Sequence, residues 1–127
     1  MQVQRHTVAL AVDASGDQTT YTTDNITGRV LQIRYVPDAS TPLDTGADLT
    51  ITGETTGTAI ITITNIGTSA IAYAPRLAIC GITGTASLFA AGGTAVQDQI
   101  YIANERVKIV VAQGGASKLG TLYLTVG

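Results

Sequence analysis

The sequence is poor in charge, has no tryptophan and only one cysteine, and contains no long hydrophobic run. Charged residues make up 13% of its 127 positions, and the formal net charge is −2. The chain lacks the concentrated Lys and Arg that would neutralise several phosphates, which argues against DNA, RNA and anionic membranes as partners. No apolar run approaches the roughly 18 to 20 residues that cross a bilayer, and Met1–His6 lacks the apolar region of a signal peptide. We expect a soluble protein that is made in a cytoplasm.

The single cysteine has no partner for an internal disulfide. Cys80 lies among apolar neighbours, which are Leu77, Ala78, Ile79 and Ile82. A free cysteine in such surroundings usually behaves as a small buried hydrophobic residue, and we predict this for Cys80.

The lone histidine and the carboxylates form no catalytic or metal-binding pattern. His6 has the same parity as Val8 and Leu10, and no serine or cysteine motif accompanies it, so it is predicted to be packed or terminal. A metal site needs several His, Cys or carboxylate ligands, and only Asp44 and Asp48 have ligand-like spacing. We therefore expect neither a metal nor another cofactor.

The residues in excess are Thr, Gly, Val, Ile and Ala, whereas Glu, Lys and Met are scarce. β-Branched side chains suit pleated strands, and glycines suit tight turns. With 127 residues and 45% apolar composition, the chain is long enough for one core. We predict an all-β protein with a single domain over residues 1–127, in which residues 1–27 form a less distinctive N-terminal segment.

Short segments of alternating apolar and polar residues, separated by turn residues, predict about eight strands. The candidates are Arg5–Val12, Gln18–Thr23 as an exposed edge, Arg29–Val36, Leu49–Thr52, Ala59–Thr64, Val107–Val111 and Leu122–Val126, with weaker ones near Ile71–Ile82 and Val96–Ile102. The fourth and fifth candidates are predicted to form a hairpin, and Val107–Val111 and Leu122–Val126 to form a closing hairpin. This spacing is typical of a two-sheet antiparallel β-sandwich or jelly-roll.

The sharpest local motif is Leu43–Asp48, which reads Leu-Asp-Thr-Gly-Ala-Asp. It is similar to the Asp-Thr-Gly-Ala core of retroviral-type aspartic proteases, in which two chains each supply one aspartate and a shared proton splits the two pKa values. A homodimeric aspartic protease that uses Asp44 is therefore one alternative for the function.

The context of this motif favours an ordinary turn. Thr41-Pro42 precedes it where a protease requires a buried strand, and the downstream segment that would brace a protease loop has no match at a suitable distance. In the turn interpretation Asp44 caps a bend, Gly46 takes a positive φ, and Asp48 stays solvated before a strand.

The segment Pro75–Thr94 is long, poorly patterned and free of acidic residues. It contains the large apolar side chains of Leu77, Ile79, Leu88 and Phe89. Two interpretations stay open. The segment either covers one end of the sandwich or exposes a contact patch for another subunit.

Four segments are similar to a known family, and they span about residues 28–127: Gly28–Tyr35, Ala47–Gly57, Tyr73–Arg76, and Leu88–Thr94 with its continuation through Ala103–Gly115. They resemble the capsid decoration (cement) or minor capsid proteins, which are small virion proteins of tailed bacteriophages. The resemblance implies a non-enzymatic β-sandwich or jelly-roll that binds the outside of an expanded head as a small oligomer and clamps neighbouring major capsid proteins. The symmetry of capsid lattices favours a homotrimer or homodimer as that oligomer. It also implies a location on the capsid surface of the virion after synthesis in the host cytoplasm.

For such a role we expect an interface made of Arg76, Leu77, Ile79, Leu88 and Phe89. The apolar side chains would be buried against the neighbour, and Arg76 would form a bidentate ion pair with a carboxylate. Weak contacts that are repeated over a lattice add up through avidity. A tail-associated or carbohydrate-binding β-sandwich is a further alternative, although the lack of tryptophan leaves no obvious platform for stacking a sugar.

Overall fold

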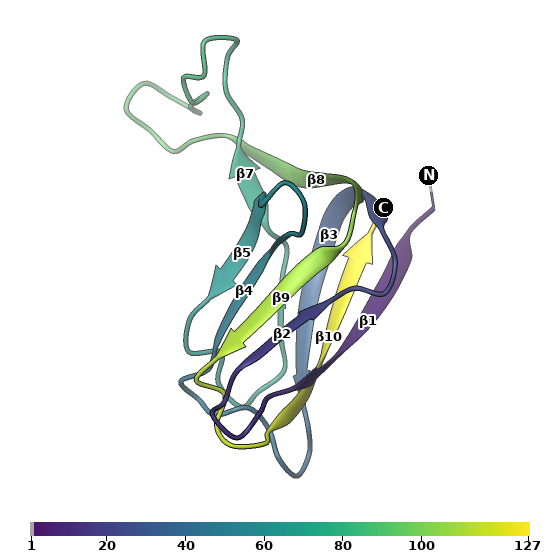
Figure 1. The fold of residues 1–127 in the computed structure, drawn as a ribbon. Coiled ribbons are helices and arrows are strands. Elements are labelled where there is room, and N and C mark those ends of the chain that lie inside the picture. The colour runs from purple at the N-terminus through teal and green to yellow at the C-terminus, as the bar shows by residue number, and fades with distance from the viewer. Residues whose placement is uncertain (1) are drawn as a thin grey trace.

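Ten β-strands in two antiparallel sheets that pack face to face make up the computed structural model, which describes residues 2–127 (Figure 1). No helix occurs within these residues, so none of them forms a helix long and apolar enough to cross a membrane. The predicted all-β class and two-sheet antiparallel sandwich are confirmed, with ten strands in place of the expected number of about eight.

The larger sheet, sheet A, has the strand order β1-β10-β3-β8-β7, and β6 also pairs with β3. Its strands are β1 (Gln4–Ala11), β3 (Ile26–Pro37), β6 (Ile71–Tyr73), β7 (Arg76–Ala78), β8 (Gln97–Glu105) and β10 (Leu119–Val126). Sheet B has the order β2-β9-β4-β5, with β2 (Gln18–Tyr21), β4 (Asp48–Gly53), β5 (Ala59–Ile63) and β9 (Val107–Ala112). The N-terminal residues thus supply one edge strand to each sheet. The edge strand predicted at Gln18–Thr23 is confirmed in its position, although it ends at Tyr21 and only Thr19 in it is exposed.

The core lies between the sheets and is built by the alternation that the sequence shows. Alternate residues of the central strands point inward, except where a register shift in β3 falls between Val30 and Gln32. The fully buried residues include Val30, Ile33, Leu122 and Leu124 from sheet A and Leu49, Ile51, Val107 and Ile109 from sheet B. Each such side chain contributes about 1.5 to 3 kcal/mol relative to an exposed position. His6 follows the same parity and is half-buried opposite Leu124, as expected for a packed residue.

One of the two predicted hairpins is present and the other is not. Strands β4 and β5 pair antiparallel, with Leu49 opposite Ile63, which confirms the first hairpin. The predicted closing hairpin is wrong, because β9 pairs with β2 and β4 in sheet B whereas β10 pairs with β1 and β3 in sheet A. The chain between them crosses from one sheet to the other. Each strand still buries one face, so the same alternation fits both arrangements.

Strand β3 divides the pairing on one of its sides. Along Ile26–Pro37 it pairs with β10 on one flank, while on the other flank β8 pairs with its first residues, up to Val30, and β6 with Ile33 to Tyr35. Strand β8 therefore pairs with β3 only from Ile100 onward, and its first residues, Gln97–Gln99, pair with β7 instead. This two-stranded ribbon of β7 and β8 leads away from the sandwich.

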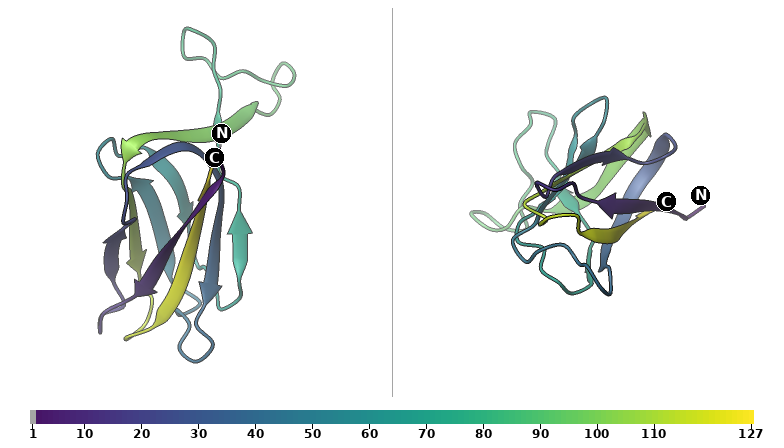
Figure 2. Two further views of the ribbon diagram at one scale, coloured as in Figure 1. Left: turned by 90° about the vertical axis from the view of Figure 1, so that its right-hand side faces the viewer. Right: turned by 60° about the horizontal axis from the view of Figure 1, so that its bottom comes forward.

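The ribbon carries a segment that projects beyond one end of the sandwich. In Figure 1 and in the left view of Figure 2 the chain between β7 and β8 extends past the end at which both termini lie. We call residues 79–96, between Ala78 of β7 and Gln97 of β8, the arm. The opposite end of the sandwich is closed by the loops after β1, β3 and β9.

Candidate interface site

The arm is held by a small set of backbone hydrogen bonds where it leaves the ribbon. The N–H of Ile79 donates to the carbonyl of Val96 at 2.9 Å, and the N–H of Val96 donates to the carbonyl of Ser87 at 2.8 Å. The N–H of Ser87 in turn donates to the carbonyl of Ile79 at 3.0 Å. These three bonds join the start, the middle and the end of the arm, so the backbone has a defined path without any regular strand.

Two tight loops form the outer part of the arm. In the first, the N–H of Gly81 donates to Thr85 O at 3.0 Å. In the second, the N–H of Phe89 donates to Thr94 O at 3.0 Å. Each loop contains a glycine with positive φ, 83° at Gly84 and 71° at Gly92, a conformation that side chains with a Cβ rarely adopt. The glycines of this segment therefore shape two short turns.

The large apolar side chains of the arm and its ribbon lie outside the core. Their exposed fractions are 58% for Leu77, 42% for Ile79, 108% for Ile82, 45% for Leu88 and 75% for Phe89. No residue between Pro75 and Ile100 is buried. Of the two interpretations of this segment, the structure shows exposure: the arm does not cover the end of the sandwich.

The prediction for Cys80 is wrong. The thiol-bearing residue is exposed and lies in the arm, where its only strand-like contact is an isolated bridge to Ala86. Its apolar sequence neighbours suggested burial, but those neighbours are themselves exposed. The physical reason is that hydrophobic residues are buried only where a second layer covers them, and the arm has none.

The arm carries no charge. No Asp, Glu, Lys, Arg or His occurs between Arg76 and Asp98, the residues that flank the segment on the ribbon. Register places Arg76 opposite Gln99 and Leu77 opposite Asp98, so the two charges lie on opposite faces of the ribbon. Arg76 is exposed and makes no hydrogen bond or ion pair with another described residue. The predicted interface residues therefore lie together at one end of the molecule, and Arg76 is located at the base of the arm.

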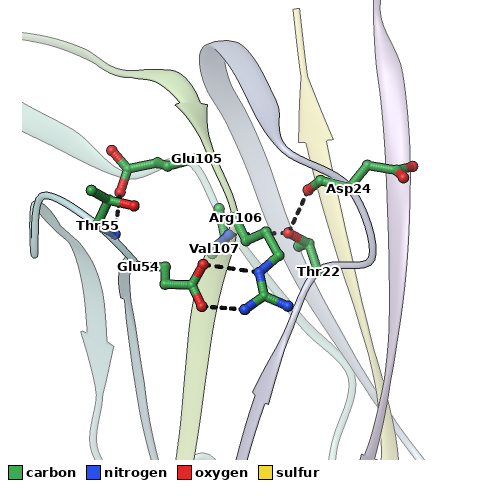
Figure 3. A network of polar contacts seen from close by, with 7 residues as sticks. All are labelled: Thr22, Asp24, Glu54, Thr55, Glu105, Arg106 and Val107. Atoms are coloured by element: carbon green, nitrogen blue, oxygen red, sulfur yellow. Dashed lines mark hydrogen bonds and ion pairs between the residues drawn. The ribbon is translucent and has the colours of Figure 1, made fainter.

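At its other end β8 is anchored to sheet B through a buried carboxylate (Figure 3). Glu105 Oε1 accepts the backbone N–H of Thr55 at 3.0 Å and that of Thr56 at 3.1 Å, and Oε2 accepts the Thr56 hydroxyl at 2.9 Å. The backbone N–H of Thr56 is the main cause that holds the pKa of the Glu105 carboxyl below its usual value, against desolvation. A Cβ at Gly53 would collide with this carboxylate, so any larger residue there would displace Glu105 from these hydrogen bonds. We call this contact the Glu105 clamp.

The next residue adds a charged contact to the same corner. Arg106 donates from Nε to Glu54 Oε1 at 2.9 Å and also pairs with Oε2 (Figure 3). Its guanidinium also lies 4.5 Å from the ring centre of Tyr21. The bidentate ion pair with Glu54 raises the pKa of Arg106 and lowers that of Glu54. The corner between β8 and β9 is thus tied to β2 and to the β4–β5 turn.

A buried threonine completes this corner. The hydroxyl of Thr22 donates to Asp24 O at 3.0 Å and accepts the N–H of Val107 at 3.0 Å (Figure 3). The start of the chain segment after β2 is therefore fixed to the start of β9. Strand β8, which supports the arm, thus ends in a corner that is held by hydrogen bonds and an ion pair.

The Asp44 motif lies at the opposite end of the sandwich and forms a turn. The N–H of Ala47 donates to Asp44 O at 3.0 Å, and Asp44 N donates to Gly114 O at 3.0 Å, so the turn interpretation is confirmed. Gly46 does not take the predicted positive φ. Asp48 begins β4, and its Oδ1 accepts the N–H of Asn65 at 3.0 Å, so it is part of the strand and only half-exposed.

A shallow cavity of 420 Å³ opens beside this turn. Its lining comes from the loops after β3, β5 and β9, namely Pro42, Leu43, Asp44, Thr45, Gly46, Thr68, Gln113 and Lys118. Asp44 supplies the only carboxylate of the lining. Within residues 2–127 no group of three or more His, Cys, Asp or Glu is placed to hold a metal ion.

Sequence reasoning missed two exposed side chains near the arm. Ile82 is fully exposed in the first tight loop, and Tyr101 on β8 is 64% exposed. The signal for Ile82 is its place between Gly81 and Gly84, because a turn that short has no inner side. Tyr101 has the parity opposite to the buried Ile100 and Ile102, so the alternation itself identifies its outward direction.

Comparison with known proteins identifies no family for this chain. The sequence matches no protein-family profile and no curated protein sequence. Among solved structures, the fold is similar to the crystal structure of FLHE, with a TM-score of 0.44 and 7% sequence identity over 99% of this chain and 98% of that chain. At this distance the likeness has no bearing on what the chain does.

Proposed function

We propose that this chain is a structural virion protein of the capsid decoration type, which binds the outer surface of a phage head through its arm and stabilises the lattice of the major capsid protein. The observation that carries the proposal is the exposed, uncharged arm on a β-sandwich. Leu77, Ile79, Ile82, Leu88 and Phe89 are 42% to 108% exposed. Large apolar side chains that are exposed together in this way mark surfaces that bind another protein.

The position of the arm fits attachment to a larger assembly. It projects beyond the sandwich, so it can reach a neighbouring protein without any rearrangement of the core (Figure 2). The Glu105 clamp fixes the far end of β8, which lowers the entropy that is lost when the arm is immobilised by a partner. Two of the segments that resemble decoration proteins, Tyr73–Arg76 and Leu88–Thr94, lie at the base and in the outer part of the arm.

Energy for such binding would come from many equivalent weak contacts. Burial of one Phe or Leu side chain is worth about 1.5 to 3 kcal/mol, and a lattice repeats the contact at every site. The symmetry of closed lattices favours a homotrimer or homodimer as the bound unit. In this proposal Arg76, at the base of the arm, pairs with a carboxylate of the major capsid protein.

The proposal is tested with capsids that lack the protein. Wild-type chain and the double variant Leu88→Asp/Phe89→Asp are mixed with such capsids and sedimented together. The variant is expected to stay in the supernatant, because two charges would have to be buried in an apolar contact. Leu119→Asp, which changes a 42% exposed residue at the opposite end of the sandwich, is the matched control and is expected to bind. Equal binding of both variants would overturn the proposal.

A further inference from the structure

The outer face of sheet A carries a row of side chains that is distinct from the arm. Register aligns Thr7, Tyr123, Arg34 and Ala72 across β1, β10, β3 and β6, and the left view of Figure 2 shows these strands side by side. Residues that are paired in this way point to the same face. Their neighbours along each strand, such as Leu122 and Leu124, are buried, so this row points to solvent.

Two arginines lie against one tyrosine in this row. Arg34 is directly opposite Tyr123 in the β3–β10 pairing, and the Arg5 guanidinium lies 5.1 Å from the centre of the Tyr123 ring. Arg5 and Arg34 are both exposed, and Tyr123 is half-buried between their strands. We call these three residues the arginine face.

No carboxylate of sheet A balances the arginine face. The strands of sheet A contain only two acidic residues, Asp98 and Glu105. Glu105 is buried in the clamp, and Asp98 pairs with Leu77 on the side of β8 opposite to Tyr101 and Gln99. Six of the nine acidic residues lie in loops, which are Asp13, Asp17, Asp24, Asp38, Asp44 and Glu54. The outward positions of the sheet therefore carry positive charge alone.

The guanidinium groups of this face keep their hydrogen-bonding capacity. Arg34 makes no hydrogen bond or ion pair with another described residue, and the contact recorded for Arg5 is with an aromatic ring, which leaves its N–H groups available. A planar guanidinium binds a carboxylate through two parallel hydrogen bonds. Arginine and tyrosine are also the residues most enriched at protein interfaces.

We propose that the arginine face is a second docking surface, and that its partner is an acidic patch on a protein. Charge complementarity requires an anionic partner, and the small size of the face favours carboxylates over a nucleic acid. A polyanion such as DNA is bound through many phosphate contacts, whereas here two cations lie on a chain whose net charge is −2. The inference does not depend on the arm, because the two surfaces belong to different parts of the fold.

In the test, a peptide of about ten glutamates is titrated into the protein at low salt, and NMR spectra are recorded at each step. The amide and side-chain signals of Arg5, Arg34 and Tyr123 are expected to shift, while those of the arm are expected to stay unchanged. The variant Arg5→Glu/Arg34→Glu is expected to weaken the apparent affinity about fivefold or more. Arg34→Gln provides a milder second variant, and the dispersion of each spectrum reports folding.

The matched control is Lys108→Glu/Lys118→Glu, which changes the net charge by the same amount away from the arginine face. This control is expected to bind the peptide nearly as the wild type does. Equal loss in both double variants, or an absence of shifts at the arginine face, would overturn the proposal. Tighter binding of a DNA oligonucleotide of equal charge through the same residues would overturn the choice of a protein partner. A failure of capsid binding by arm variants leaves these outcomes unaffected, so the two proposals are tested separately.

Discussion

The Glu105 carboxylate accepts the backbone N–H of Thr56 at 3.1 Å and thereby joins the corner between β8 and β9 to the β4–β5 turn across the two sheets. The same carboxylate also accepts the N–H of Thr55, so a single buried acid satisfies two backbone donors of a turn. Because β8 continues from this corner into the ribbon below the arm, the contact fixes the support of the candidate interface.

The Glu105 clamp makes the stability of the protein dependent on pH. The folded-state pKa of Glu105 lies below the ordinary glutamate value of 4.5, so its contribution to stability is present above that pH and is lost as the pH falls through the folded-state pKa. Glu105→Gln is expected to lower the midpoint of thermal unfolding at neutral pH. The variant should also lose less of its midpoint than the wild type when the pH is lowered below 4.5. Asp44→Asn, which removes a charge from an exposed turn, is the control at neutral pH. An unchanged midpoint for Glu105→Gln would contradict the role of the clamp.

The arm and the core are expected to respond differently to truncation. Leu124→Ala removes a side chain that is 1% exposed and should cost about 2 to 5 kcal/mol of unfolding free energy. Ile82→Ala changes a side chain that is fully exposed and should cost less than about 0.5 kcal/mol. Urea unfolding of the two variants measures both values. A large loss for Ile82→Ala would mean that the arm packs against the sandwich in solution.

The exposure of Cys80 predicts a reactive thiol in the native protein. Because the residue lies in the arm and outside the core, an aromatic disulfide reagent should modify it completely without denaturant, at a rate within about tenfold of that in the unfolded chain. The measurement is absorbance of the released thiolate with and without urea. Strong protection in the native state would show that the arm is covered.

Gln18 protects one edge of sheet A. Its side-chain Oε1 accepts the N–H of Ala11 at 2.8 Å, on the edge of β1 that faces away from β10. Gln18→Ala should cost about 1 kcal/mol, because it leaves this donor without its partner. It should also increase association through the open edge. Gln32→Ala, on the exposed face of β3, is the control in urea unfolding and in sedimentation velocity. Identical behaviour of the two variants would count against this edge contact.

Much of the fold could be predicted because period-two alternation reports which residues are buried. Arg29–Val36 and Leu49–Thr52 both fall within observed strands, and β4 and β5 form the expected hairpin. Alternation does not report the identity of a strand's neighbour. Strands β9 and β10 each bury one face, whether they pair with each other or lie in opposite sheets, and for this reason the closing hairpin was predicted wrongly.

The candidate site could be located from the sequence, but its exposure could not. An uncharged apolar segment without a period marks Pro75–Thr94 as unusual, yet the same composition suits a buried cap and an exposed arm. The apolar neighbours of Cys80 likewise fit a buried site, although the residue is exposed. The exposure of the arm depends on the point at which β8 separates from β3, which lies before Ile100. That point is set by the tertiary pairing of β3 with both β6 and β8.

The most direct test of the proposed role is quantitative mass spectrometry of purified virus particles from the source of this chain, measured as copies of the chain per copy of the major capsid protein. Decoration of the whole lattice predicts about one copy per major capsid protein. A far smaller but constant ratio would place the chain at a vertex or in a tail. Complete absence from the particles would contradict the structural role, and Asp44 would then be the first residue to test for another function.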